Sequence, residues 1–296
     1  MEDRAGPWVR FADGLRRLTP AELAARLTCL TLLFSPVGDW FVRPAAMALA
    51  GAGLLLPGAW RSPWLWGALA LLTGARVISD WPLADNHAYL LFYWCVALAV
   101  AAALRDPEVL ARNARLLIGL VFAAAAWQKW TSPDYPNDVF FLTTFLLDPR
   151  FTDFTLLFTT LTPDEIETGR AYLEALYREP GSAPPFPFPL PASFRLLASA
   201  STWWNLFEQT LVAASFLAPP ASRLGRLRDA AMLLFCFTIY AVAPVPSFGW
   251  LLLAMTAAQG TPTLRARLWL LGCFAILGFY YEVPWAGLLL ELRAAP

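Results

Sequence analysis

The sequence predicts an all-α, polytopic integral membrane protein with about nine transmembrane helices. The first observation is composition: 58% of the residues are hydrophobic and only 15% are charged, whereas about 25% are charged in soluble domains. The second is that apolar runs near bilayer-spanning length recur along the chain. These runs are residues 23–38, 44–59, 63–79, 87–104, 114–130, 194–217, 227–243, 246–260 and 264–285. We therefore expect one membrane domain, residues 23–296, after a cytoplasmic segment, residues 1–22.

The distribution of arginines predicts the orientation of the chain. Alternate connections, together with the N-terminal segment, hold Arg61, Arg105, Arg112, Arg115, Arg223, Arg226, Arg228, Arg265 and Arg267, and Arg43 is the exception. By the positive-inside rule, the N-terminus is cytoplasmic and the C-terminus is outside. We expect this orientation in a bacterial inner membrane.

The cytoplasmic segment is expected to lie on the membrane surface. Trp8, Phe11, Leu15 and Leu18 recur at helical spacing opposite arginines. This pattern is typical of a short amphipathic helix in the membrane interface.

The longest connection, residues 131–193, is an insert on the outer face in this topology. The sequence TPDE that begins at Thr162 combines a capping box with a proline at the first helical position. It predicts a helix over 163–178. The following PPFPFPLP, residues 184–191, predicts a stiff polyproline-like connector back to the membrane. The insert is the natural candidate to cover a pocket or to receive a substrate.

Composition argues against two classes of partner. The formal net charge is +0 and there is no basic block, so we expect no nucleic-acid partner. The cysteines all lie in apolar stretches, at spacings that fit neither a disulfide framework nor a zinc site: Cys29, Cys95, Cys236 and Cys273. We expect no metal.

Polar residues of several predicted spans converge near the outer leaflet. Lys129 is the only lysine of the chain and lies at the outer end of the fifth span. His87, the only histidine, lies in the connection that precedes the fourth span. The sixth span contains Asn205, Glu208 and Gln209 within an apolar run. Ionisable groups at membrane depth normally face the bundle interior or a wet cavity, so we predict a pocket here.

Lys129 also has a purely structural interpretation. Between Trp127 and Trp130 it would extend its amine toward lipid head groups. Arginine does this equally well, however, and every other basic residue of the chain is arginine. Only lysine becomes a neutral amine when it is desolvated, which favours a chemical role.

The other polar and aromatic residues have structural alternatives as well. His87 would serve as a cap for a helix that begins at Ala88. Glu208 is explained most simply as a buried carboxylate that is hydrogen-bonded to a neighbouring helix. Trp203 and Trp204 fit either an aromatic belt or a pocket wall.

Four segments together resemble the vitamin K-dependent gamma-carboxylases and their bacterial relatives, the HTTM-domain proteins. They are DNHAYLL (85–91), GLVFAAAAWQKWTSPDY (119–135), WWNLFEQTLVAASFL (203–217) and FCFTIYAVAPVPSFGWLLLAM (235–255). The resemblance covers most of spans three to eight. Its most specific parts are the Asn-His pair and the lysine.

This resemblance implies roles for individual residues. By position, Lys129 matches the catalytic base that deprotonates the hydroquinone, and Asn86 and His87 match the pair near the quinone head. We take His87 as a second catalytic residue. Asn86 is a cofactor-binding candidate, and the other candidate residues of the quinone pocket are Trp127, Trp204 and Glu208.

The implied activity is the deprotonation and oxygenation (epoxidation) of a reduced quinone of the vitamin K hydroquinone or menaquinol type. Dioxygen is the co-substrate, and CO2 joins it where the reaction is coupled to carboxylation of a second substrate. That substrate would be a peptide or protein on the outer face, and membrane lipid is the other partner.

The chain departs from the family pattern at two points. Phe235 is followed by Cys236, where the family usually has Phe-His, and no large outer-face domain follows the last span near residue 285. The second departure weighs against carboxylation of a protein. Rival interpretations are a non-catalytic transporter or assembly protein with the same polar pocket, a retinal-type Schiff-base protein and a structural remnant. Replacing Lys129 by Arg distinguishes these interpretations, because arginine keeps the charge and the membrane anchoring but supports neither base nor imine chemistry.

Overall fold

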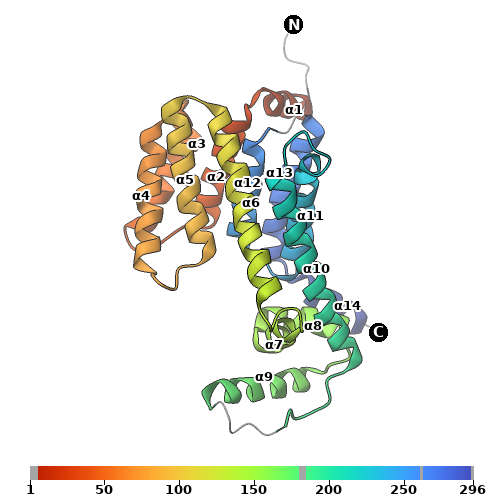
Figure 1. The fold of residues 1–296 in the computed structure, drawn as a ribbon. Helices are drawn as coiled ribbons and strands as arrows, with labels where there is room; N and C mark the ends of the chain where they lie inside the picture. The colour runs from red at the N-terminus through yellow and green to blue at the C-terminus, as the bar shows by residue number, and fades with distance from the viewer. Residues whose placement is uncertain (1–5, 180–184, 261–262, 295–296) are drawn as a thin grey trace.

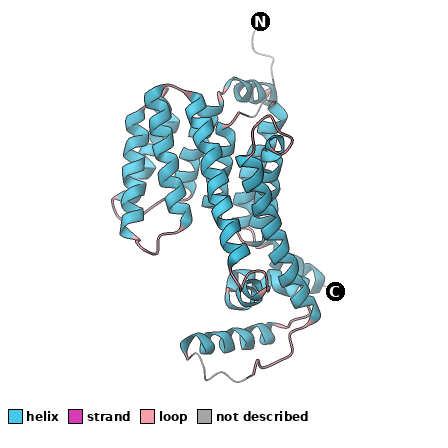
Figure 2. Cartoon of the chain, in the orientation of Figure 1, coloured by secondary structure: helices cyan, strands magenta, loops and turns pink. Residues whose placement is uncertain are grey.

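The computed structural model describes residues 6–179, 185–260 and 263–294, and within them it contains helices and no strand (Figures 1 and 2). The α-helices are α1 (Pro7–Arg17), α2 (Pro20–Phe34), α3 (Val42–Leu55), α4 (Pro63–Ser79), α5 (Asn86–Leu104), α6 (Pro107–Thr131), α7 (Val139–Leu147), α8 (Thr152–Phe158), α9 (Pro163–Arg178), α10 (Ala192–Leu217), α11 (Arg228–Val242), α12 (Pro246–Ala258), α13 (Leu264–Glu282) and α14 (Trp285–Ala294). Three short 3-10 helices are η1 (Ala59–Arg61), η2 (Pro149–Phe151) and η3 (Gly225–Leu227). The all-α prediction is confirmed for these residues.

The long helices form an elongated bundle in which the chain runs back and forth (Figure 1). Each of the predicted apolar runs lies mainly on one helix, α2 to α6 or α10 to α13. The helix α1 lies at one end, which we call the α1 end. The helix α14 and the helices α7 to α9 of the insert lie at the other end, the insert end.

Three helices, α5, α6 and α13, are long and apolar enough to cross a membrane. The helix α3 and the Ser247–Ala258 part of α12 are apolar but shorter. The described residues therefore agree with a helical membrane protein. The number of spans and their orientation stay predictions.

Local sequence signals explain where several helices begin. A proline in the first turn follows a capping side chain in α2, α4, α6 and α9. The caps are Thr19, Ser62, Asp106 and Thr162, each of which accepts a hydrogen bond from a backbone N–H of the first turn. These caps satisfy donors that have no partner inside the helix.

Two short helices were predicted from sequence, and both form. The helix α9 has the predicted bounds, and both hydrogen bonds of its capping box are present. The helix α1 is also present, with Trp8 and Phe11 exposed and Leu15 buried. The connector that was predicted at 184–191 begins at Pro184, which lies outside the described residues.

The described residues contain two hydrophobic clusters, and α10 contributes to both. The larger cluster, the bundle core, contains Val212 and Phe216 from the second half of α10. The smaller cluster, the insert core, joins side chains of α7 to α9 to Phe194, Ala198 and Leu206, which precede Val212 and Phe216 on α10. The insert is therefore a packed unit seated on α10.

The C-terminal region differs from the sequence prediction. The last span was expected to run to residue 285, but α13 ends at Glu282 and a separate helix, α14, follows. The helix α14 packs on α8 of the insert. Arg293 fixes this contact by donating a hydrogen bond to the carbonyl oxygen of Leu157, at 2.8 Å.

Candidate active site

Lys129 continues the face of α6 that packs on the bundle. The buried positions of this helix include Ala114, Ile118, Phe122 and Ala126, at a spacing of four residues. Residues three or four positions apart lie on the same helix face. Lys129 follows Ala126 by three positions, so it is directed toward α10, the neighbour of α6.

The amine of Lys129 is held by neutral groups. Its Nζ donates a hydrogen bond to Oε1 of Gln209 on α10, at 2.9 Å. It also lies 5.4 Å from the centre of the Tyr135 ring, a cation–π distance. The side chain is half-buried, and within the described residues it forms no ion pair with a carboxylate.

The side of α10 that holds Gln209 contains further buried polar groups. Thr202 and Asn205 precede Gln209 by seven and four positions, so the three share a face. Oγ1 of Thr202 and Oδ1 of Asn205 are buried and form no hydrogen bond with the described residues, and the same holds for the hydroxyl of Tyr135. Buried polar atoms normally have a partner, so this face has the properties of a ligand site.

Glu208 lies beside this face and is only 1% exposed. Its Oε1 accepts a hydrogen bond from the hydroxyl of Thr238 on α11, at 2.7 Å. Its Oε2 is buried without a hydrogen-bond partner among the described residues. The predicted bond to a neighbouring helix is therefore present, but it uses only one oxygen and leaves the other as an acceptor.

The tryptophans of the site differ in their surroundings. Nε1 of Trp204 donates to the same Thr238 hydroxyl, at 3.2 Å, which joins Trp204 to the Glu208 group. Trp130 contacts Trp203, with ring centres 5.9 Å apart. Trp127 is 72% exposed, so it lies on the outer surface of α6.

His87 lies in the first turn of α5, next to Asn86. The helix begins at Asn86, with Asp85 at the N-cap position. The alternative in which His87 is the cap of this helix is therefore wrong, because the helix begins two residues before Ala88, where that alternative requires it to begin. The imidazole ring instead stacks on Phe248 of α12, with ring centres 4.2 Å apart.

His87 lines a cavity of about 210 Å³ between α2, α4, α5 and α12. The polar lining includes Arg76, Asp80 and Asp85. Lys129 is not among its lining residues. The structure places Lys129 and His87 at the same end of the bundle, on the adjacent helices α5 and α6, but in different surroundings.

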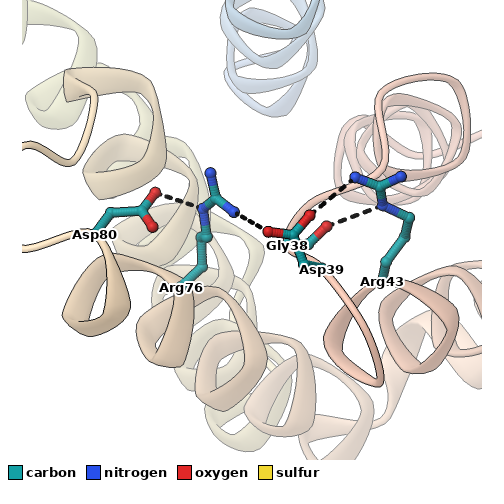
Figure 3. A network of polar contacts seen from close by, with 5 residues as sticks. All are labelled: Gly38, Asp39, Arg43, Arg76 and Asp80. Carbon is teal, nitrogen blue, oxygen red and sulfur yellow. Dashed lines mark hydrogen bonds and ion pairs between the residues drawn. The ribbon is translucent and has the colours of Figure 1, made fainter.

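Three of the lining residues, Gly38, Arg76 and Asp80, belong to a network of polar contacts that continues to Asp39 and Arg43 (Figure 3). Arg76 pairs with Asp80 at 2.6 Å and with Asp39 at 3.4 Å, and Asp39 also pairs with Arg43 at 3.3 Å. Nε of Arg43 donates to the carbonyl oxygen of Gly38, at 2.9 Å. Arg43, the exception in the arginine pattern, is thus neutralised locally.

Sequence reasoning did not identify Tyr135 and Thr238 as parts of the site. Tyr135 closes the quoted SPDY segment directly after α6, and its position after a span was an available signal. Thr238 is the one serine or threonine inside the apolar run of α11. Such a residue usually bonds to its own helix, and Thr238 does so as well.

Comparisons with family models, curated proteins and solved structures found no match. The resemblance to the gamma-carboxylases therefore stays an interpretation of the four quoted segments.

Proposed function

We propose that this protein is a membrane enzyme that deprotonates a reduced quinone, with the amine of Lys129 as the base. The observation that carries the proposal is the hydrogen bond from Lys129 to the neutral amide of Gln209, with no carboxylate partner among the described residues. A carboxylate would hold the amine as an ammonium ion, whereas a neutral amide does not. Half-buried lysine is the side chain best suited to switch between the two forms.

The surroundings of Lys129 support both forms of the amine. As a free base, Nζ presents a lone pair while Oε1 of Gln209 accepts one N–H and fixes its direction. When Nζ takes a proton, the same oxygen and the face of the Tyr135 ring stabilise the new positive charge. The site therefore lowers the cost of proton uptake without trapping the proton.

The remaining groups of the site fit a quinol. A bound hydroquinone supplies two hydroxyl donors and, with dioxygen, the redox chemistry of the reaction. Oε2 of Glu208 and Oδ1 of Asn205 are buried acceptors of matching kind, and Trp204 lies beside them as an aromatic wall. We assign His87 and Asn86, on the adjacent helix α5, to positioning the far side of the ligand.

The proposal includes nine spans, with the α1 end in the cytoplasm of a bacterial cell and the insert end outside. Support comes from the concentration of arginines at the α1 end and from the positive-inside rule. The second substrate, a peptide or protein that receives CO2, would then meet the insert on the outer face.

The test is quinol-dependent oxygen consumption by the purified protein. The variant Lys129→Arg keeps the charge and the length of the side chain but does not release its proton. We expect the rate to fall about a hundredfold or more, with unchanged helicity and membrane insertion. The matched control is Arg112→Lys, on the exposed surface at the opposite end of α6, which should leave the rate unchanged.

A rescue experiment completes the test. Lys129→Ala with a small exogenous amine should regain part of the lost rate, because the amine supplies the missing base. If Lys129→Arg consumes oxygen at the wild-type rate, the lysine is a membrane anchor and the enzyme proposal is wrong. Transport would then become the better candidate, since the cavity at His87 is lined by ionised side chains.

A further inference from the structure

The α1 end contains a second large cavity, of about 720 Å³, far from Lys129 along α6. Its walls come from α2, from η1 and α4, from α5 and from the start of α6. The volume lies within the range of about 300–1,000 Å³ that is usual for ligand pockets. It shares no lining residue with the candidate active site.

Small side chains open this cavity inside the bundle. Ala21 and Ala25 of α2 face Ala101 and Ala102 of α5 across it. Because the side chain of alanine is a single methyl group, these positions leave space between the helices. The methyl groups are also apolar, so the inner wall suits a hydrocarbon chain.

Two arginines lie among the lining residues at the ends of the surrounding helices. The Arg61 guanidinium stacks over the Trp60 ring at 4.9 Å, and Arg105 is the C-cap of α5. Both are exposed, and neither forms an ion pair with a described residue. Stacking orients the plane of a guanidinium and leaves its N–H edge available for a phosphate.

The other polar groups of the lining do not cancel this charge. Among the described residues, Asp106 is the one acidic lining residue, and its Oδ1 accepts the backbone N–H of Glu108 in the first turn of α6, at 2.8 Å. Trp66 is fully buried, and its Nε1 donates to the carbonyl oxygen of Trp60, at 2.7 Å. That bond anchors η1, and with it Arg61, to α4.

We infer that this cavity binds an anionic phospholipid. The phosphate contacts Arg61 and Arg105, and an acyl chain lies against the alanines of α2 and α5. Basic pockets between transmembrane helices bind anionic lipid head groups in this way. Alanine walls with two arginines at the rim match an amphiphile better than a free anion, which would leave the apolar wall without a partner.

The experiment compares three probes by native mass spectrometry of the full chain purified in detergent. They are dioleoylphosphatidylglycerol, dioleoylphosphatidylcholine and inorganic phosphate. We expect the wild type to retain phosphatidylglycerol at least about tenfold more tightly than phosphatidylcholine, because a net-anionic head group gains charge-assisted bonds. Equal retention of the two lipids overturns the proposal. Binding of inorganic phosphate at the same affinity as phosphatidylglycerol also overturns it.

Variants locate the site. Arg61→Gln combined with Arg105→Gln should weaken phosphatidylglycerol retention about tenfold or more. The control combines Arg223→Gln with Arg265→Gln, which removes two exposed arginines outside the cavity lining and should retain the lipid. If both pairs behave like the wild type, the site is not here.

A third variant tests the apolar wall independently of charge. Ala102→Phe fills the cavity and should reduce retention of phosphatidylglycerol, whereas Ala124→Phe, on the exposed surface of α6, should not. Wild-type retention by Ala102→Phe overturns the assignment of the acyl chain. Circular dichroism and elution volume check that each variant is folded.

Discussion

At the scale of single residues, the bond between Lys129 and Gln209 sets the chemistry of the proposed site. Gln209 is 8% exposed and is placed by a long helix that is packed over its whole length. The amide can accept from the amine but adds no charge. Replacing the amide of Gln209 by a carboxylate of the same size changes only the charge beside Lys129. This change therefore tests the proposal more sharply than removal of the lysine.

We predict that Gln209→Glu lowers quinol-dependent oxygen consumption about tenfold or more at neutral pH. The new carboxylate, at the distance now bridged by a 2.9 Å hydrogen bond, stabilises the ammonium form of Lys129. Activity should recover as the assay is made more alkaline. The matched control is Gln128→Glu, on the exposed surface of α6. A Gln209→Glu enzyme with the rate and pH profile of the wild type would contradict a base role for Lys129.

Rarity in the sequence identified Lys129 and His87, and the structure places both at the insert end. Their surroundings were not predictable in the same way. The contact of Lys129 with Tyr135 depends on the turn that follows α6, and the cavity at His87 depends on how α2 and α12 approach α5. Side-chain periodicity describes one helix at a time, so it predicts neither the contact of Lys129 with Tyr135 nor the cavity at His87.

At the scale of elements, the turn between α7 and α8 is fixed by a charged cap. Asp148 accepts hydrogen bonds from the backbone N–H of Arg150 and from its guanidinium. The Arg150 side chain lowers the pKa of the Asp148 carboxyl below its ordinary value. Because this carboxyl titrates lower in the folded protein, its stabilising contribution is present above the unfolded pKa, about 3.9, and is lost as the pH falls through the folded value.

We predict a pH-dependent stability difference between the wild type and Asp148→Asn. Above about pH 5 the variant should melt about 1–3 °C lower, and the difference should shrink as the pH falls below about 4. Thermal unfolding followed by circular dichroism measures it. Asp134→Asn, an exposed position of the same insert, is the control. A constant difference down to pH 3 would exclude the ion pair as its cause.

Local signals decided which elements were predictable. The helix α9 follows from its capping box and proline, which act within one turn of the chain. The helix α14 was not predicted as a separate element, because its apolar residues follow those of α13 after a two-residue break. The break at Val283 and Pro284 is consistent with the exclusion of proline from helix interiors.

At the scale of the whole molecule, the first and the last described helices, α1 and α14, lie at opposite ends of the bundle (Figure 1). The order of the apolar helices was predicted from the sequence, but their neighbours were not. Helices that are apolar on every side show no stripe that marks the protein-facing surface, and contact with lipid or protein is equally apolar. The pairing of α6 with α10 and of α2 with α12 appears only in the structure.

The proposed orientation predicts the accessibility of two engineered cysteines. Thr168→Cys, exposed on α9, should react with a membrane-impermeant thiol reagent in intact cells, and Ala221→Cys, exposed at the α1 end, should react only after permeabilisation. The four native cysteines are buried, so the background should be low, and the wild type is the control. Ser182 of the same insert is another position for an engineered cysteine on the outer face, but it lies outside the described residues. The reverse labelling pattern would place the insert in the cytoplasm.

The division of α10 between two hydrophobic clusters bears on how the protein opens. Leu206 belongs to the insert core and Val212 to the bundle core, so Gln209 lies at the boundary between them. We expect the two clusters to open as separate cooperative units, which native-state hydrogen exchange would resolve by their different opening free energies. Opening of the insert alone would expose the amine of Lys129 while the bundle stays folded. Access to the site is then governed by a sub-global equilibrium of the insert, at a lower free energy than unfolding of the whole chain.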